Sequence, residues 1–312
     1  MEDKKVRCLI TGGSGFQGSH LTKALLAKGY SVRCLDRYKP TRKAEGDFEF
    51  VEGDFSATHL IADAIRGCDV IFHLACTTLP QTSNEDPDFD VSSNVLGTIR
   101  MLDEAVKAKV KRFIFISSGG TVYGIPSMVP IPESHPTNPT CSYGITKLTI
   151  EKYLRLYWNL HGLSSCSVRL ANPYGENQRF DSIQGVIAAF CYNALSEQKI
   201  TIWGDGSVRR DFIYISDVID ALLLLLDAPL NGCEINIGSG QALSINEIIG
   251  HIEHLTGKMI ERNYLPARPF DVPVSELDIK FAHEELSWVP KTNFTDGLRL
   301  TINWMKNAVI KH

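Results

Sequence analysis

A tyrosine and a lysine stand four positions apart in the stretch SYGITK, as Tyr143 and Lys147. In a helix this spacing places both side chains on one face, one turn apart. A free phenol has a pKa near ~10, so it is a poor base at neutral pH. A lysine ammonium beside the phenol favours its ionised form and lowers that pKa. The pair therefore predicts general acid–base chemistry, with Tyr143 as the proton-transfer group.

A glycine-rich segment near the N-terminus has the features of a dinucleotide-binding loop. TGGSGFQG (11–18) follows the first predicted strand and opens the first predicted helix, and Gly12, Gly15 and Gly18 have the spacing GxxGxxG. Gly12 permits a tight turn, Gly15 lets the backbone approach a pyrophosphate, and Gly18 lets the helix pack closely on the sheet. The helix N-terminus adds free N–H groups and a dipole that favour phosphate.

The residue at the end of the second predicted strand indicates which dinucleotide binds. Asp36 stands there, and its carboxylate can accept hydrogen bonds from both hydroxyls of the adenosine ribose. The same charge repels a 2′-phosphate, which predicts NAD rather than NADP. Arg37 opposes this interpretation, because an arginine can pair with that phosphate. Asp54, after the third strand, is either an adenine contact or a turn residue.

The pattern of strands and helices predicts the scaffold for these residues. Apolar runs that do not alternate indicate strands covered on both faces, and helices between them indicate βαβ units. The predicted strands are 6–11, 31–36, 48–53, 69–75, 112–118 and 165–171, and the predicted helices are 16–28, 58–66, 92–109 and 142–161. The fold class is therefore α/β, a Rossmann-type doubly wound parallel sheet.

The second half of the chain has a looser pattern. It predicts helices at 183–196, around 221–226, and at 278–286 and 295–309, with strands at 199–204, 211–217, 234–239 and 259–266. We expect a smaller C-terminal α/β lobe that binds the substrate. The predicted division gives 1–172 to the NAD-binding domain, with 211–238 returning to it, and 173–312 to the interleaved substrate lobe.

Composition excludes several classes of function. The 312 residues carry a formal net charge of −4, so no basic field indicates nucleic acid. The eight cysteines form no CxxC pair and the nine histidines form no HExxH pattern, so we expect reduced thiols and no metal site. MEDKK leads directly into a strand and the longest apolar run, 221–226, is too short for a membrane span. We therefore expect a cytoplasmic protein.

Together these residues resemble the extended short-chain dehydrogenase/reductase family, in particular its NAD-dependent sugar-nucleotide epimerase/dehydratase branch. The resemblance covers almost the whole chain and rests on TGGSGFQG, HLA (73–75), NVLGT (94–98), SSGGTVYG (117–124), YGITK (143–147), RLANPYG (169–175) and RRDFIYISD (209–217). It is strongest to the UDP-hexose 4-epimerases, and it implies a UDP-sugar substrate and an NAD that stays bound through turnover. It also implies a homodimer formed through the helices at 92–109 and 142–161.

The resemblance also implies the cofactor contacts. Lys147 would hold the nicotinamide ribose in addition to assisting Tyr143. The full implied set of cofactor-binding residues is Gly12, Gly15, Phe16, Gln17, Gly18, Asp36, Arg37, Asp54, Phe55, Leu74, Ala75, Asn94, Ser117, Tyr143, Lys147 and Pro173.

The segment SSGGTVYG departs from the family at one position. Many relatives carry a serine or threonine two residues before the threonine of TVYG, and this chain has Gly119 there. Thr121, Ser118 or a water molecule must then hold the substrate hydroxyl near Tyr143. Gly119 and Gly120 would also widen the pocket.

The same segment limits the reaction. Dehydratase relatives carry an Asp–Glu pair where Gly120 and Thr121 stand, and decarboxylating relatives carry glutamate in place of Thr121. The resemblance therefore implies 4-epimerisation, in which Tyr143 takes the C4 hydroxyl proton, a 4-keto sugar turns over, and hydride returns to its other face. The alternatives are another oxidoreductase of the branch, such as a 4-keto reductase or a UDP-glucuronate epimerase, and a non-catalytic dinucleotide-sensing module.

Residues of the second half would bind the nucleotide and sugar by resemblance. Asn172, Arg210 and Arg268 would contact the diphosphate, for which two arginines supply fixed charge and forked donors. Trp203 would lie near the uracil. Ser275 stands where epimerases restricted to glucose and galactose carry tyrosine, so we expect room for an N-acetyl group; the alternative is a plain loop residue.

Overall fold

The computed structural model describes residues 5–40, 44–181, 185–268 and 272–308, which form two compact units. Unit 1 comprises 1–122, 139–169 and 219–235, and unit 2 comprises 123–138, 170–218 and 236–312. The chain passes repeatedly between the two units. Segments 123–138, 170–172, 211–218 and 236–238 belong to unit 2, whereas the predicted division gives them to the NAD-binding domain; which unit binds NAD and which binds substrate stays a prediction. The first four residues and the ends of two predicted helices, at 183–184 and 309, lie outside the described residues.

A seven-stranded sheet forms the centre of unit 1, with the strand order β10-β6-β5-β4-β1-β2-β3. Its strands are β1 (Arg7–Thr11), β2 (Ser31–Asp36), β3 (Phe48–Glu52), β4 (Val70–His73), β5 (Arg112–Ser118), β6 (Ser165–Leu170) and β10 (Cys233–Ile237). The pairs β1–β2, β1–β4, β2–β3 and β4–β5 are parallel. Most residues of β1, β2, β4, β5 and β6 are buried, as continuous apolar runs predict. The predicted Rossmann-type sheet is confirmed.

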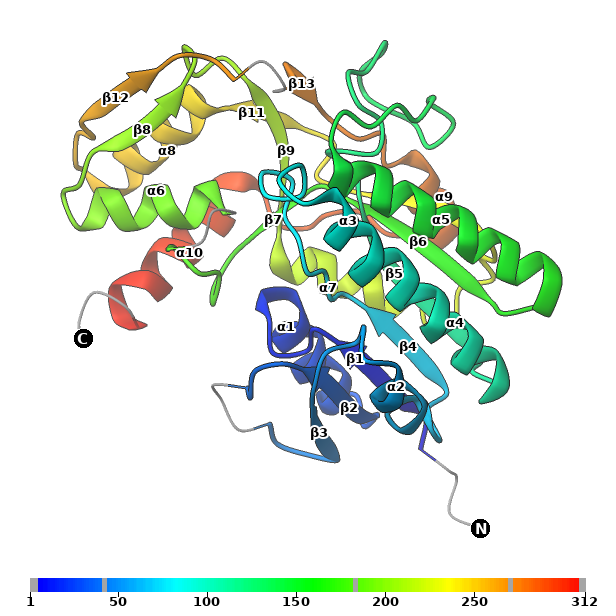
Figure 1. The fold of residues 1–312 in the computed structure, drawn as a ribbon. Coiled ribbons are helices and arrows are strands. Elements are labelled where there is room, and N and C mark those ends of the chain that lie inside the picture. Colours follow the sequence, from blue (N-terminus) through cyan, green and yellow to red (C-terminus); the bar gives the residue numbers. More distant parts are fainter. Residues whose placement is uncertain (1–4, 41–43, 182–184, 269–271, 309–312) are drawn as a thin grey trace. The chain divides into compact units, whose positions relative to one another are not determined.

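Helices cover this sheet (Figure 1). They are α1 (Phe16–Ala27), α2 (Thr58–Ile65), α3 (Pro87–Asp90), α4 (Gly97–Lys107), α5 (Ser142–His161) and part of α7 (Ile215–Leu224). The helices α2, α4 and α5 pack side by side and bury a core that includes Phe113, Met101 and Leu154. The longest of them, α5, ends where Gly162 adopts a left-handed conformation at φ 67°.

The predicted helix at 92–109 is divided in two. A π-helix, η1 (Val91–Leu96), follows α3 directly and precedes α4. The short α3 begins at Pro87, where the carboxylate of Asp86 accepts the N–H of Phe89. π-Helical turns are rare and frequently lie at functional sites. Apolar periodicity cannot reveal one, because a single wide turn shifts the pattern by only one residue.

The described residues of unit 2 form two sheets and a set of helices. Its sheets contain β7 (Asn172–Tyr174), β9 (Arg209–Tyr214), β11 (Ala242–Ser244) and β13 (Val274–Ser275) in one group, and β8 (Ile200–Trp203) with β12 (Arg262–Leu265) in another. Its helices are α6 (Val186–Leu195), α8 (Ile245–Thr256), α9 (Lys280–Leu286) and α10 (Phe294–Ala308). The sequence reading missed α8, although Ser244 and Glu247 form a capping box at its start.

Across the described ranges, no helix has the length and apolar character needed to cross a membrane. Within the same part of the chain, no group of three or more histidine, cysteine and acidic residues is placed to hold a metal ion.

Candidate active site

The glycine loop between β1 and α1 has the geometry of a phosphate cradle. Gly12 has φ +74°, which a side chain would strain, and a Cβ atom added there would lie 3.0 Å from the backbone nitrogen of Ala75. A Cβ atom on Gly18 would lie 2.2 Å from the carbonyl oxygen of Gly12. The N-cap of α1 is Gly15, and no side chain caps the helix there. The first N–H groups of α1 are therefore available to a pyrophosphate.

A polar atom of this loop also lacks a partner. The side-chain oxygen of Gln17 is buried and accepts no hydrogen bond. Buried polar atoms are nearly always paired, so this oxygen indicates a ligand that donates to it. The loop thus fits a dinucleotide both in its backbone and in its side chains.

Asp36 lies where the adenosine ribose is expected. Its carboxylate accepts the backbone N–H groups of Ser14, at 3.0 Å, and Tyr38, at 3.2 Å. These contacts orient the carboxylate and leave lone pairs for ribose hydroxyls. The Arg37 guanidinium lies 4.0 Å from Asp54 and stacks over the Tyr38 ring. The choice between Asp36 and Arg37 as the residue that selects the cofactor stays a prediction.

Tyr143 and Lys147 lie on one side of α5, as the spacing predicts. The Lys147 ammonium is 5.4 Å from the centre of the Tyr143 ring and donates to the carbonyl of Ile116 at 2.8 Å. Burial raises the pKa of the Tyr143 phenol well above its usual value, although the residue as a whole is only half-buried. Burial also lowers the pKa of Lys147. Positive charge beside the phenol must therefore offset desolvation before Tyr143 can act as a base.

The hydroxyl groups near Tyr143 differ in their availability. Ser117 donates to Glu151 at 2.5 Å in a buried pair, so its hydroxyl is engaged within the protein. The Thr121 hydroxyl is buried and has no partner. A Cβ atom on Gly120 would meet nothing within 4 Å, which leaves open space beside Thr121. Ser118 is half-buried. The structure thus offers Thr121 as a donor to a ligand, while the choice between Thr121 and Ser118 stays a prediction.

Two predicted cofactor residues have structural partners. Both N–H groups of the Asn94 amide face Asp90 and Thr78, and its oxygen accepts the N–H of Thr77. Phe55 is buried against the ring of His73. The roles of Asn94 and Phe55 toward NAD stay predictions, and so do those of Leu74, Phe16 and Pro173.

The predicted substrate residues form two groups within unit 2. Ser275 pairs with Arg210 in the register of β13 and β9, and Ser275 is buried. The Arg268 guanidinium lies 4.3 Å from the ring centre of Trp203, a distance typical of a cation–π contact. The Asn172 amide donates to the backbone carbonyl of Asp211 on β9. The side chain of Asn172 is thereby oriented beside the strand that carries Arg210.

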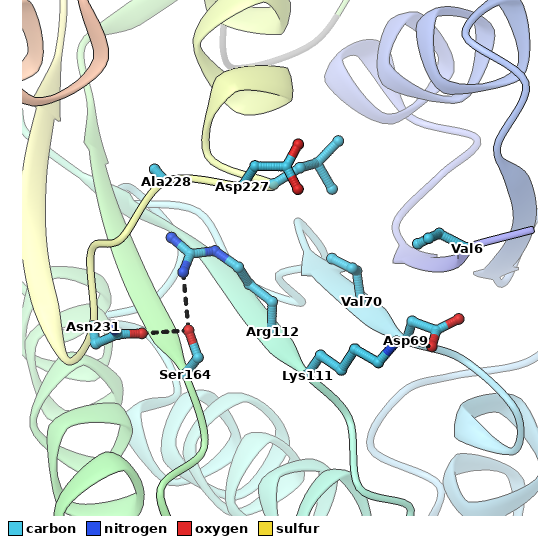
Figure 2. Close-up of a pocket in the computed structure, with 10 residues that line it drawn as sticks. Val6, Asp69, Val70, Lys111, Arg112, Ser164, Asp227, Ala228 and Asn231 are labelled. Atoms are coloured by element: carbon cyan, nitrogen blue, oxygen red, sulfur yellow. Dashed lines mark hydrogen bonds and ion pairs between the residues drawn. The ribbon is translucent and has the colours of Figure 1, made fainter.

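A pocket of about 420 Å³ opens at the amino ends of β1, β4 and β5 (Figure 2). Lys111 pairs with Asp69 there, and Arg112 donates to Ser164. The residues that line it include none of the predicted site residues. Asp36 and Ser118 are instead the last residues of β2 and β5, and Gly12 follows β1 directly, so all three lie at the carboxyl ends of strands, where ligands bind in open α/β sheets.

The comparisons agree with the geometry. A family model described as the NAD dependent epimerase/dehydratase family matches residues 8–238. The UDP-glucose 4-epimerase of Mycolicibacterium smegmatis is 36% identical over 312 residues, which cover 97% of this chain and 99% of that protein. The chain belongs to the NAD-dependent epimerase/dehydratase family.

Solved structures of the epimerase/dehydratase family resemble the whole fold. The UDP-glucose 4-epimerase of Thermotoga maritima with UDP-glucose has a TM-score of 0.92 and 33% identity, covering 97% of this chain and 100% of that one. The UDP-glucose 4-epimerase of Thermus thermophilus in complex with NAD has a TM-score of 0.90 and 31% identity, with the same coverage. This chain is thus an NAD-dependent enzyme of the UDP-glucose 4-epimerase type.

NAD fits the residues that are present. The loop at Gly12–Gly18 would hold its pyrophosphate, Asp36 its adenosine ribose and Lys147 its nicotinamide ribose. Sequence reasoning overlooked one buried residue beside this site, Asp90, which stands in the acidic stretch EDPDFD and resembles a surface residue there.

Proposed function

We propose that this protein is a 4-epimerase of a UDP-hexose or a UDP-N-acetylhexosamine. The observation that carries the proposal is the set of groups around Tyr143. It includes the cation of Lys147 and the buried, unpartnered hydroxyl of Thr121, with open space at Gly120. Elimination of water or carbon dioxide from the sugar would need carboxyl groups at positions 120 and 121. This chain carries glycine and threonine there.

Tyr143, Lys147 and Thr121 have different roles in one cycle of epimerisation. Tyr143 removes the proton of the C4 hydroxyl and later returns it, so no net proton is consumed. Lys147 keeps positive charge beside the phenol and thereby offsets the desolvation that disfavours the phenolate. Thr121 holds the C4 oxygen. Bound by the glycine loop, Asp36 and Lys147, NAD would supply reversible hydride transfer at C4.

Unit 2 supplies the contacts that we propose for the UDP part. Arg210 and Arg268 would bind the diphosphate together with Asn172, and Trp203 would stack on the uracil. The exposed indole of Trp203 already lies against the Arg268 guanidinium, so both side chains are held near each other.

Ser275 would set the range of sugars. A buried serine leaves more room than a tyrosine, and its hydroxyl can bond to an acetamido group at C2. We expect UDP-N-acetylglucosamine to be epimerised at least as well as UDP-glucose. A pocket change of this kind alters relative kcat/KM by roughly 10–200-fold.

The direct test is incubation with UDP-glucose, UDP-N-acetylglucosamine and UDP-glucuronate, with products resolved at C4 and bound NAD measured afterwards. Inversion at C4 with NAD retained supports the proposal. A product reduced at C4 with oxidised cofactor released would identify a 4-keto reductase, and no conversion of any of the three substrates would contradict the proposal.

Ser275→Tyr tests the sugar range, with Val274→Tyr as the matched control because neighbouring strand residues face opposite sides. Ser275→Tyr should suppress turnover of the acetylated sugar selectively. An equal loss for both sugars, or the same loss in Val274→Tyr, would refute the assignment of Ser275.

We also propose a homodimer formed through α4 and α5 and a cytoplasmic location. Ile145, Leu156 and Leu160 of α5 are exposed and lie on one face of the helix. Leu160→Glu should therefore convert a dimer into a monomer in analytical ultracentrifugation, whereas a wild-type monomer would contradict the proposal.

The free cysteines of the described residues are compatible with a reducing compartment.

A further inference from the structure

The side chain of Asp90 is fully buried, at 0% exposure, at the end of α3. Its carboxylate accepts four hydrogen bonds from other side chains. The donors are Thr78 at 2.5 Å, Ser142 at 2.7 Å, and Asn94 and Thr146 at 2.9 Å. A buried carboxylate is costly unless it is fully hydrogen-bonded, so this arrangement is a built site rather than an accidental burial.

The two oxygens of Asp90 bind different segments. One oxygen accepts from Thr78 and Asn94, which belong to the loop after β4 and to the π-helix. The other oxygen accepts from Ser142 and Thr146, both in the first turns of α5. Ser142 precedes Tyr143 directly and Thr146 precedes Lys147 directly. Asp90 therefore joins the start of the catalytic helix to the segment before it.

The N-terminus of α5 depends on this segment. Its N-cap residue, Cys141, makes no side-chain capping bond. The N–H of Ser142 instead donates to Asn84 at 2.9 Å, and the N–H of Tyr143 donates to Ser83 at 3.0 Å. An α-helix leaves its first N–H groups without internal partners, and caps contribute measurably to its stability. Residues 83–90 thus cap α5 from outside the helix.

The charge of Asp90 acts on both catalytic groups. It raises the pKa of the Tyr143 phenol, after the larger effect of burial and together with Cys76 and Cys141. It also raises the pKa of Lys147, as do Cys76 and Glu151, against the desolvation that lowers it. Removal of this charge should therefore lower the pKa of the phenol and that of the ammonium.

We propose that Asp90 is a positioning residue for the reaction, which holds the first turns of α5 through Ser142 and Thr146 and thereby fixes Tyr143 toward the sugar. The effect on turnover rests on the proposed function. Misplacement of a reacting group by about 1 Å can cost on the order of 10²-fold in rate. Loss of the hydrogen bonds that hold the first turns of α5 should lower kcat. It should leave KM nearly unchanged, because Asp90 is fully buried and so does not contact the substrate.

The first test compares Asp90→Asn with Asp88→Asn, an exposed change of the same charge on the same helix. Asp90→Asn should lower kcat at least ~10-fold with KM within about twofold, since even part of the ~10²-fold positioning effect is that large. Its acid limb in the pH–rate profile should move to lower pH, because the phenol ionises more easily. Asp88→Asn should match wild type in both respects. A wild-type kcat with an unmoved acid limb in Asp90→Asn would overturn the proposal.

Milder variants keep the test valid if Asp90→Asn does not fold. Ser142→Ala and Thr146→Val each remove one donor to Asp90, whereas Thr149→Val removes a hydroxyl that bonds only to Ile145 within the helix. The first two should lower kcat, and the double variant should lower it further, while Thr149→Val should not. Equal effects in all three would overturn the proposal.

A substrate-free measurement separates this proposal from the proposed function. The ultraviolet absorbance of tyrosinate is titrated in the NAD-bound protein and in its Tyr143→Phe counterpart, and the difference reports Tyr143. The same pair is then measured with Asp90→Asn. If the transition moves to lower pH while no UDP-sugar is converted, the proposed function fails and the effect of Asp90 stands. If epimerisation is normal and the transition does not move, the inference about Asp90 fails.

Discussion

The close approach between α1 and the loop before it makes Gly18→Ala an informative substitution. An added Cβ would lie 2.2 Å from the Gly12 oxygen and 2.6 Å from the Cα of Gly13, whereas real Cβ atoms essentially never approach within 3.0 Å. The loop must therefore retreat by at least 3.0 − 2.2 = 0.8 Å. Both obstructing groups are backbone, so no side chain can rotate away. Overpacking of this kind costs about 1–3 kcal/mol.

Gly250→Ala supplies the matched control. Gly250 also lies inside a helix, α8, but an added Cβ there would meet nothing within 4 Å. Alanine should stabilise that helix by about 1 kcal/mol relative to glycine. The same gain applies at Gly18, so the net destabilisation of Gly18→Ala should be up to about 2 kcal/mol after the steric cost.

The assay combines denaturant unfolding with titration of NAD. Gly18→Ala should lower the free energy of unfolding and weaken NAD binding at least ~10-fold, because loss of one charge-assisted N–H contact to the pyrophosphate costs about 1.5–3 kcal/mol. Gly250→Ala should raise stability without changing NAD affinity. If Gly18→Ala binds NAD as tightly as wild type, the loop does not hold the pyrophosphate and the assignment of the cradle is wrong.

Three further predictions concern single groups. Tyr143→Phe should reduce turnover ~10²–10⁴-fold in a steady-state assay with NAD binding preserved, and retention of more than a tenth of the activity would assign the base elsewhere. Thr121→Val should reduce kcat more than Ser118→Ala does, and the reverse order would give Ser118 the orienting role. Burial raises the pKa of Asp211 from 3.8 to about 6, so its contribution to stability is largest below its unfolded pKa and is lost as the pH rises through about 6. Denaturant unfolding of wild type relative to Asp211→Asn should show a loss of up to about 3 kcal/mol between pH ~4 and ~7, and a difference independent of pH would contradict this.

The sequence was sufficient for the strands of the unit 1 sheet, for the glycine loop after β1, and for the placement of Tyr143 and Lys147 on one helix. Apolar runs such as 112–118 match β5 residue for residue, because a strand covered on both faces tolerates few polar side chains. Tyr143 and Lys147 were predictable because their spacing is a local property of one helix.

Asp90 was not predictable for a physical reason. Its donors Ser142 and Thr146 lie 52 and 56 residues away in the chain, so no local pattern connects them. The π-helix that follows it changes the register by one residue, which apolar periodicity does not resolve. The capping box of α8, in contrast, was visible as Ser244 and Glu247 and was overlooked.

The pairing of Ser275 with Arg210 has an evolutionary consequence. The strand β13 consists of two residues, and it is held at the edge of β9 in parallel register. Paired residues of neighbouring strands point to the same face of a sheet, so a mutation that enlarges residue 275 brings its side chain against that of Arg210. Lineages that change one of these positions should accumulate compensating changes at the other, so that the two co-vary instead of diversifying independently.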